Sequence, residues 1–210
     1  MSFNSHRGTL YIRVGPMFSG KTTWLNGELT QLADKNFKVL KILHSSDNRE
    51  DVASSDLKGS THNSSYKHLT DKITCIRTNS LTDIDVSGYN VIGIDESQFF
   101  SDLLVNVAFW VENLGIHLRV SGLDGDCFKQ KFGQTLDLIP ICDEITKLNA
   151  SCHFCLLDLH KLNFKGNILS IVGPFTKRID NNTQQTLIGG SGKYLPVCRF
   201  HHINSHTENL

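Results

Sequence analysis

Short apolar runs, many of them β-branched, alternate with polar or helix-like segments along the first part of the chain. Five of these runs predict strands, namely Thr9–Val14, Lys38–Leu43, Ile73–Arg77, Asn90–Ile94 and His117–Ser121. Strands that alternate with helical segments usually form parallel sheets. The pattern therefore predicts an α/β fold built on a mostly parallel sheet.

Two helices are predicted between these strands. The segment Thr23 to Asp34 follows the first strand and has a helix-like composition. A second helix is indicated by apolar residues that recur at three- and four-residue intervals: Phe100, Leu103, Leu104, Val107, Val111 and Leu114. Such spacing gives a helix one apolar face, which we interpret as packing against the core.

The alternation ends after Asn149, where the character of the chain changes. Paired cysteines, glycines and short β-like runs such as Ile168 to Val172 follow. We therefore expect two domains, an α/β domain over residues 1–149 and a smaller domain over residues 150–210.

A glycine-rich segment between the first predicted strand and helix matches the pattern G-x-x-x-x-G-K-[ST]. It reads Gly15-Pro16-Met17-Phe18-Ser19-Gly20-Lys21-Thr22. In such a loop, backbone N–H groups and the helix dipole point at phosphates, Lys21 adds a positive charge and Thr22 is a magnesium ligand. The alternative is a strand-to-helix turn with a lysine by chance. The order of strand, loop and helix favours a P-loop.

Two acidic residues end the predicted strand Asn90–Ile94. Near a phosphate loop, Asp95 can hold magnesium, directly or through water. Glu96 then faces the reacting phosphate, where a carboxylate can accept a proton from an attacking hydroxyl or from water. The alternative is an acidic helix N-terminus favoured by the helix dipole. Together with the phosphate loop, the pair favours phosphoryl transfer.

Four residues near the C-terminus have the spacing of zinc ligands: Cys152-x-x-Cys155 and Cys198-x-x-His201. Two intervening residues let a tight turn direct both side chains at one ion, and two such turns complete a closed, structural site. The alternatives are buried free thiols, or His202 in place of His201 as the fourth ligand.

Composition narrows the classes of protein. At 210 residues, with 39% hydrophobic and 20% charged residues, the chain can bury a sizeable core. Lysine plus arginine equals aspartate plus glutamate, at 21 each, so no basic surface argues for direct nucleic-acid binding.

No apolar run approaches the roughly 18 residues of a membrane span, and no signal peptide is recognised. We expect a cytoplasmic protein with reduced thiols, in which Cys75, Cys127 and Cys142 are small buried hydrophobes.

Five segments in order resemble the cytosolic, zinc-containing thymidine kinases, the type II thymidine kinase family. They are Gly15–Thr22, Ile94–Phe100, Gly122–Asp126, Phe175–Arg178, and Ile188–Tyr194 ahead of Cys198. The resemblance extends from about Gly8 to about His202. It implies a P-loop α/β domain and a small zinc-held domain whose long loop, the lasso, closes over the nucleoside. It also implies transfer of the γ-phosphoryl of ATP to the 5′-hydroxyl of thymidine, and of deoxyuridine.

The resemblance implies roles for individual residues. Glu96 is the catalytic base, and Lys21 and Arg49 complete the catalytic set. ATP and magnesium contact Gly15, Pro16, Met17, Phe18, Ser19, Gly20, Lys21, Thr22, Asp47, Asp95 and Gln98. The nucleoside contacts Met17, Phe99, Leu123, Phe128, Phe132, Thr176, Gln185, Leu187, Ile188, Gly189 and Tyr194. Without the resemblance, Asp47 and Arg49 would be interpreted as a solvated polar loop, and the apolar side chains as core.

The chain departs from the family pattern at two places. The segment Leu156 to Pro174 is longer than the usual connection, so we expect an extra loop in the zinc domain. Cys127 stands where an aromatic residue is often found, so either Phe128 takes that role or the base pocket is lined differently. The resemblance implies a homotetramer and leaves feedback inhibition by dTTP open.

Two other functions remain to be distinguished. A P-loop ATPase with a zinc knuckle that engages nucleic acid is disfavoured by the balanced charge. A regulatory module that binds nucleotide without turnover is disfavoured by the intact pair Lys21 and Glu96.

Overall fold

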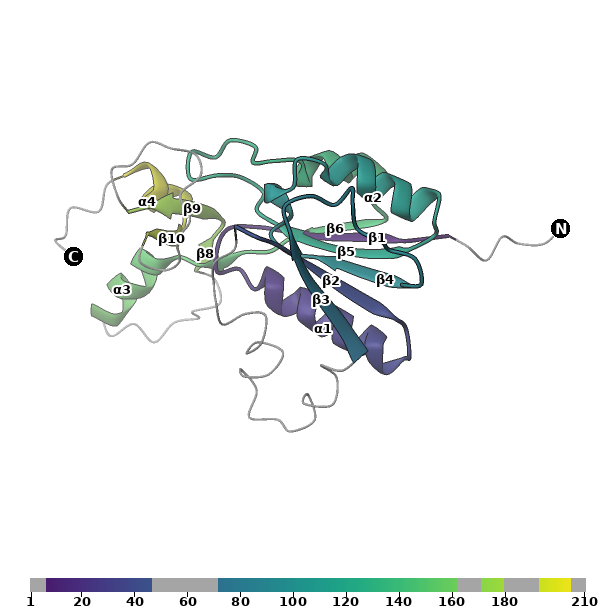
Figure 1. Ribbon diagram of the computed structural model, residues 1–210. Coiled ribbons are helices and arrows are strands. Elements are labelled where there is room, and N and C mark those ends of the chain that lie inside the picture. The colour runs from purple at the N-terminus through teal and green to yellow at the C-terminus, as the bar shows by residue number, and fades with distance from the viewer. Residues whose placement is uncertain (1–6, 47–71, 162–170, 180–192, 205–210) are drawn as a thin grey trace.

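Six parallel strands form the central sheet (Figure 1). The computed structural model describes residues 7–46, 72–161, 171–179 and 193–204. The strands are β1 (Leu10–Val14), β2 (Val39–His44), β3 (Ile73–Thr78), β4 (Val91–Ile94), β5 (His117–Gly122) and β6 (Glu144–Lys147). Their order is β3-β2-β4-β5-β1-β6, and every neighbouring pair is parallel. The predicted fold class is confirmed.

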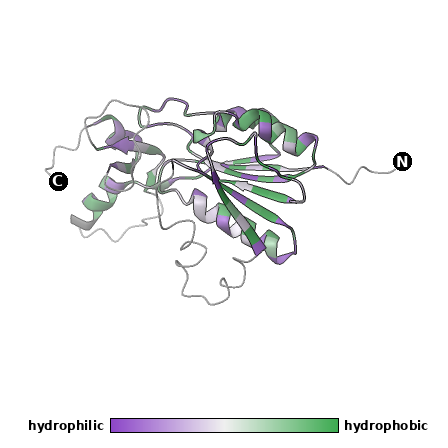
Figure 2. Cartoon of the chain, in the orientation of Figure 1, coloured by the Kyte–Doolittle hydropathy of each residue, from purple (hydrophilic) through white to green (hydrophobic). Residues whose placement is uncertain are grey.

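Helices cover both faces of the sheet (Figure 1). On one face lies α1 (Lys21–Asp34), and on the other lies α2 (Leu103–Glu112). Two 3₁₀ helices, η3 (Ser97–Phe99) and η4 (Thr135–Ile141), follow β4 and β5. Because both faces are covered, the strands are rich in apolar residues, which Figure 2 shows as green segments.

Each face has its own buried cluster. The cluster beneath α1 includes Leu25, Leu29, Ala33, Val39, Ile73 and Val91. The larger cluster beneath α2 includes Leu10, Ile12, Ile42, Ile92, Leu103, Val107, Trp110 and Leu118. A lysine is also buried in β2: Lys41 is 1% exposed, and its Nζ donates a hydrogen bond to Asn26 Oδ1 at 2.7 Å. The hydrogen bond to Asn26 on α1 offsets part of the cost of burying the charged Lys41 side chain.

All five predicted strands are present within one residue of their expected ends. Strand β6 was not predicted. The prediction that one apolar face of the second helix packs on the core was wrong in part, because Leu104 is 36% and Leu114 is 47% exposed. The expectation that Cys75 is buried was also wrong, since it lies exposed on the edge strand β3.

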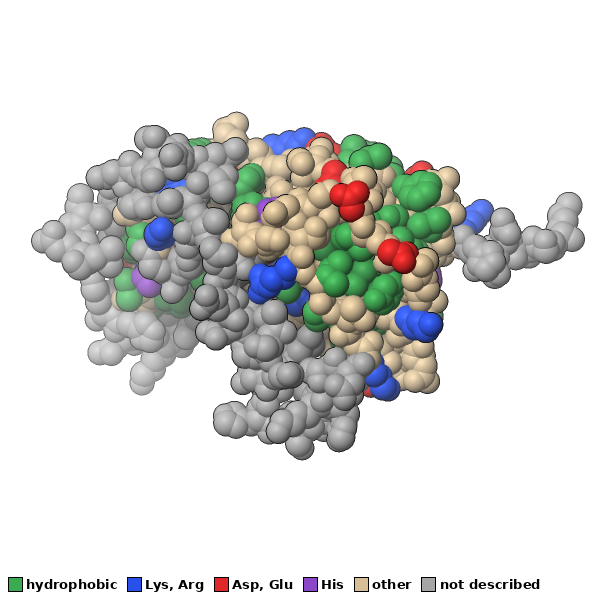
Figure 3. Space-filling view, in the orientation of Figure 1, with side chains coloured by type: hydrophobic (Ala, Val, Ile, Leu, Met, Phe, Trp, Pro, Cys, Tyr) green, Lys and Arg blue, Asp and Glu red, His purple; other side chains and the backbone are tan. Residues whose placement is uncertain are grey.

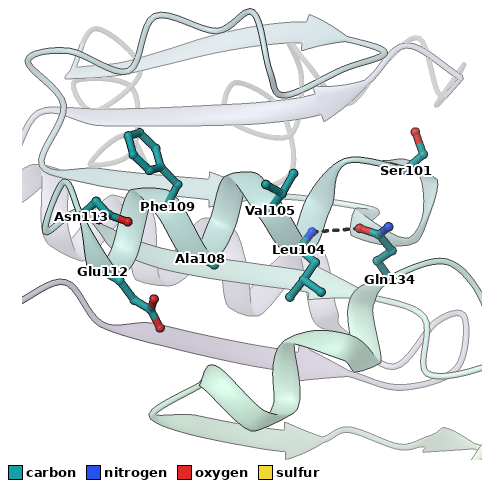
Figure 4. A pocket seen from close by; sticks show the side chains of 8 residues that line it. All are labelled: Ser101, Leu104, Val105, Ala108, Phe109, Glu112, Asn113 and Gln134. Atoms are coloured by element: carbon teal, nitrogen blue, oxygen red, sulfur yellow. Dashed lines mark hydrogen bonds between the residues drawn. The ribbon is translucent and has the colours of Figure 1, made fainter.

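The outer side of α2 borders a hollow of about 490 Å³ (Figure 4). Its lining includes Leu104, Val105, Ala108 and Phe109, and the backbone N–H of Leu104 donates to Gln134 Oε1. Hydrophobic side chains also gather at the right of the face in Figure 3.

Among the described helices, none is both long and apolar enough to cross a membrane.

A smaller unit follows β6. It contains two antiparallel pairs, β7 (Ala150–Ser151) with β8 (Val172–Gly173) and β9 (Phe175–Arg178) with β10 (Tyr194–Val197). Its helices are α3 (His153–Lys161) and α4 (Arg199–Ile203). The start of the unusually long segment Leu156 to Pro174 therefore continues α3 as helix. Residues 162–170 of that segment lie outside the described part.

Candidate active site

The carboxyl ends of β4, β5 and β1 meet at one edge of the sheet, because these strands are adjacent and parallel. The glycine-rich loop leaves β1 at this edge and leads into α1. Together these segments enclose a hollow of about 330 Å³. It is lined by Met17, Phe18, Ser19, Gly20, Lys21, Thr22, Thr23, Glu96 and Leu123. The structure thus brings the phosphate-loop pattern and one of the two predicted acids into one site.

Two glycines give the loop its shape. Gly20 has φ of 84° at the start of α1, a backbone conformation that side chains disfavour. Gly15 has φ of 153°, and a Cβ there would lie 2.4 Å from the carbonyl oxygen of Leu148. Because neither position tolerates a side chain without strain, the glycines are required by the fold of the loop itself.

The ammonium group of Lys21 lies inside the phosphate loop. The residue is 7% exposed, and its Nζ donates to the carbonyl oxygen of Pro16 at 2.6 Å. A longer contact of 3.4 Å joins Nζ to Ser19 Oγ. The ammonium therefore lies among the backbone groups that a phosphate would contact.

Asp95 is buried beside the phosphate loop and is 2% exposed. Its Oδ1 accepts hydrogen bonds from Thr22 Oγ1 at 3.2 Å, Ser121 Oγ at 2.6 Å and its neighbour's backbone nitrogen at 3.0 Å. Its Oδ2 is buried and has no hydrogen-bond partner among the described residues. A buried carboxylate oxygen without a donor is costly unless a cation or water contacts it. Asp95 and Thr22 therefore fit a magnesium site.

Ser121 is a site residue that the sequence analysis missed. It is fully buried in β5 and donates the shortest of the hydrogen bonds to Asp95. A signal was available, because a polar residue near the carboxyl end of a buried parallel strand faces the ligand edge of the sheet.

Glu96 follows Asp95 in a left-handed backbone conformation, with φ of 49° and ψ of 44°. This region is uncommon for residues other than glycine and is often found at functional sites. Glu96 lines the hollow beside the phosphate loop. Gln98 Nε2 donates to Glu96 Oε2 at 2.6 Å.

The residues assigned to the nucleoside differ in whether they line the hollow. Met17 and Leu123 line the hollow, and Thr176 Oγ1 accepts a hydrogen bond from the backbone nitrogen of Met17 at 3.0 Å. Phe99 and Phe132 contact each other edge to face, with ring centroids 5.7 Å apart, but do not belong to that lining.

Two further residues assigned to the nucleoside are Tyr194, in β10 of the smaller unit, and Phe128. Tyr194 is buried, and its hydroxyl accepts a hydrogen bond from Arg178 at 2.6 Å. Phe128 is 46% exposed, whereas the neighbouring Cys127 is buried. The remaining assigned positions lie outside the described residues: Asp47, Arg49, Gln185, Leu187, Ile188 and Gly189.

Three cysteines and a histidine form a second cluster, in the smaller unit. The ligand atoms of Cys152, Cys155, Cys198 and His201 all lie within 4.8 Å of one another. His201 Nδ1 is 3.3 to 3.4 Å from each of the three Sγ atoms. His202 points elsewhere, with Nε2 3.1 Å from the carbonyl oxygen of Cys127. Each pair of ligands stands at the start of a helix, α3 or α4, rather than in a turn of a hairpin.

The thiols of this cluster differ in acidity. Burial and the neighbouring Cys152 raise the pKa of Cys155 to about 12. Burial opposes ionisation of Cys198 as well, but hydrogen bonds from the backbone N–H of His201 and from the neighbouring thiols lower its pKa. Metal binding requires thiolates, which a divalent cation stabilises. Three sulfurs and one imidazole nitrogen make a complete tetrahedral donor set, so the cluster fits a closed zinc site.

The chain is similar to known proteins over most of its length. A family model described as thymidine kinase matches residues 8–202. The thymidine kinase of Yaba monkey tumor virus (strain VR587) is 35% identical over 198 residues, which cover 93% of this chain and 95% of the relative. Thymidine kinase a of Arabidopsis thaliana is 34% identical over 95% of this chain and 76% of its own length. The thymidine kinase of vaccinia virus (strain Tian Tan) is 32% identical over 94% of this chain and 98% of its own.

Among solved structures, the UvsW helicase from bacteriophage T4 aligns with 68% of this chain and 54% of its own, with a TM-score of 0.39 and 16% identity. This overlap is too low to bear on fold or function. The matched range, residues 8–202, contains the whole sheet, the phosphate loop and the Cys/His cluster. The chain belongs to the thymidine kinase family.

Proposed function

We propose that this chain transfers the γ-phosphoryl group of ATP to the 5′-hydroxyl of thymidine, giving dTMP and ADP, and that it also accepts deoxyuridine. The observation that carries the proposal is the hollow that Glu96 lines together with the residues of the phosphate loop. Family membership supports the choice of substrates.

In this reaction Glu96 accepts the proton of the 5′-hydroxyl as its oxygen forms a bond to the γ-phosphorus of ATP. The bond from that phosphorus to the bridging oxygen breaks, and ADP leaves. Lys21 neutralises charge on the phosphates, and Arg49 is assigned the same task. A bound magnesium ion would neutralise charge that develops on the phosphates. Thr22 and Asp95 would hold it.

The nucleoside is proposed to lie against Leu123 and Met17, with Thr176 and Tyr194 near the methyl group of thymine. The lasso residues Gln185 to Gly189 would recognise the edge of the base through main-chain groups. One methyl group in an apolar pocket is worth about 1 to 3 kcal/mol, so thymidine should be preferred only modestly over deoxyuridine. Deoxycytidine reverses the donor and acceptor pattern of the base edge and should be rejected strongly.

The Cys/His cluster is proposed to bind one structural zinc ion. All four positions of a tetrahedral site would be taken by protein ligands, which leaves none for a substrate. We place the division of the chain near Asn149, with the phosphate loop in residues 1–149 and the zinc site in residues 150–210. A homotetramer is a further prediction from the family resemblance, a cytoplasmic location is a further prediction from the sequence, and inhibition by dTTP stays open.

The proposal is tested by incubating the protein with ATP, magnesium and a panel of nucleosides, followed by chromatography of the monophosphates. We expect dTMP and a smaller yield of dUMP, with little product from deoxycytidine or purine nucleosides. Equal use of deoxycytidine or deoxyguanosine would contradict the assignment of the base pocket. Hydrolysis of ATP without formation of any nucleoside monophosphate would contradict the proposed kinase activity.

A further inference from the structure

Gln98 connects the two sides of the active-site hollow. Its Nε2 donates to Glu96 Oε2 at 2.6 Å, and its Oε1 accepts from the backbone nitrogen of Leu123 at 2.9 Å. Glu96 follows β4, and Leu123 follows β5. One buried amide, 4% exposed, therefore joins the carboxylate to a wall of the hollow.

The orientation of this amide follows from its partners. A backbone N–H can only donate, so the atom of Gln98 that faces Leu123 must be the amide oxygen. The amide nitrogen then faces Glu96, where a carboxylate oxygen accepts the hydrogen bond. A rotated amide would leave the N–H of Leu123 without an acceptor and place oxygen against oxygen at Glu96.

Two glycines make room for Gln98. A Cβ on Gly122 would lie 3.0 Å from Gln98 Oε1 and only 2.2 Å from Ser97 Oγ. A Cβ on Gly133 would lie 2.1 Å from the backbone oxygen of Gln98, and Gly133 has φ of 60°. Close approach of two other segments therefore fixes both the backbone and the side chain of Gln98.

We propose that Gln98 is a positioning residue, which holds the carboxylate of Glu96 where it can accept the proton of the nucleoside hydroxyl. The proposal rests on the proposed function, because it takes Glu96 to be the base. The hydrogen bond from the amide restrains rotation of the carboxylate about its side-chain bonds after the left-handed turn at Glu96. Small displacements of a reacting group cost up to about 10²-fold in rate.

This role differs from contact with ATP, which the family resemblance assigned to Gln98. A residue that contacts ATP mainly affects the KM for ATP when it is replaced. A residue that holds the base affects kcat and leaves the KM values for both substrates nearly unchanged.

The test uses Gln98→Glu, which keeps the length of the side chain and an acceptor for Leu123 but loses the N–H that faces Glu96. We expect kcat to fall roughly 10- to 100-fold, with KM for ATP and thymidine within about twofold of the wild type. Gln134→Glu is the matched control, since Gln134 Oε1 also accepts a backbone hydrogen bond, from Leu104 at 2.9 Å, and Gln134 lines the hollow beside α2 rather than the one that Glu96 lines. Its kcat should equal that of the wild type.

A double variant separates positioning from a general structural effect. In Glu96→Gln there is no carboxylate to hold, so adding Gln98→Glu should change the residual rate by less than about twofold. Gln98→Met, which buries no new charge, is measured in the same way, so that the test stands if Gln98→Glu fails to fold. Wild-type kcat in both Gln98 variants, a raised KM for ATP at unchanged kcat, or the full rate loss in the Glu96→Gln background would each overturn the inference.

Failure of the proposed function gives a different result. The wild type would then form no dTMP, or Glu96→Gln would react at the wild-type rate. An active wild type, an impaired Glu96→Gln and unaffected Gln98 variants would overturn the positioning role alone.

Discussion

The backbone nitrogen of Met17 donates a hydrogen bond to Thr176 Oγ1 over 3.0 Å. Met17 belongs to the phosphate loop, whereas Thr176 lies in β9 of the smaller unit and is 5% exposed. The phosphate loop is therefore tied directly to the unit that contains the Cys/His cluster. Binding of phosphate and stability of the smaller unit should depend on each other through this contact.

Thr176→Val removes the acceptor while keeping the shape of the side chain. The N–H of Met17 then loses its partner, and we expect the free energy of unfolding to fall by about 1 kcal/mol and the KM for ATP to rise several-fold. Thr176→Ser, which keeps the hydroxyl, should resemble the wild type. Urea denaturation and steady-state kinetics measure both effects. Equal behaviour of the valine and serine variants would show that the hydrogen bond does not matter.

Asp95→Asn tests the buried carboxylate beside the phosphate loop. The amide is a weaker magnesium ligand than a carboxylate, so we expect kcat to fall by about 10²-fold and half-maximal activity to require more magnesium. Ser121→Ala removes only the 2.6 Å hydrogen bond to Asp95 Oδ1 and should have a smaller effect. Rates are measured over a range of magnesium concentrations. An unchanged magnesium dependence in Asp95→Asn would be incompatible with the proposed metal site.

The Cys/His cluster predicts one zinc ion per chain by elemental analysis of protein purified without chelators. Cys152→Ser should lose the zinc and lower the melting temperature, because metal binding contributes directly to folding free energy. His202→Gln is the control, since His202 lies beside Cys127 rather than in the cluster. It should retain the metal. Zinc-free wild type, or zinc retained in Cys152→Ser, would disprove the ligand set.

The surroundings of His117 predict that this residue makes the free energy of unfolding depend on pH. Thr9 Oγ1 lies 3.0 Å from His117 Nδ1, within hydrogen-bond distance, and also accepts a hydrogen bond from Arg119 at 3.3 Å. Burial and the charge of Arg119 lower the pKa of His117 in the folded protein. The unfolded chain then binds more protons as the pH falls below about 6.5, the usual value for histidine. Stability from this residue is complete above that pH and declines below it.

We therefore expect the wild type to lose more stability than His117→Gln between pH 7.5 and pH 5.5 (roughly one unit either side of the ordinary histidine pKa). Urea denaturation at both values measures the difference. Loss of metal at low pH affects both proteins alike, so the comparison isolates His117. Parallel declines in the two proteins would contradict the neutral state of the imidazole.

The middle of the sheet was predictable because β2 and β4 are buried along their whole length and consist mostly of apolar residues. Strand β6 escaped prediction because Glu144-Ile145-Thr146-Lys147 is an edge strand with mainly polar residues, and only its pairing with β1 defines it. Helix α2 was predicted, and Leu103 and Val107 of its predicted apolar face are buried, but Trp110 was not expected there and Leu104 is partly exposed. Trp110 packs on the core while Phe109 is 51% exposed. The spacing of apolar residues cannot distinguish the two when most of a helix is apolar.

The active site was predictable only where residues are close in sequence. The phosphate loop and the pair Asp95 and Glu96 are local patterns with known chemistry. The role of Gln98 depends on the left-handed turn at Glu96 and on Leu123 from another strand. The bond between Thr176 and Met17 likewise joins residues 159 positions apart. The division near Asn149 and the roles of Asp47, Arg49 and the lasso remain predictions.

We propose that Glu96 serves as the base in phosphorylation of thymidine. This claim is tested most directly by measuring dTMP formed from ATP and thymidine by the wild type and by Glu96→Gln, with binding of both substrates checked by calorimetry. The wild type should form dTMP and ADP in equal amounts. Glu96→Gln should bind both substrates but form dTMP at least about 10²-fold more slowly, because an amide cannot accept the proton. No dTMP from the wild type, or a wild-type rate in Glu96→Gln, would contradict the claim.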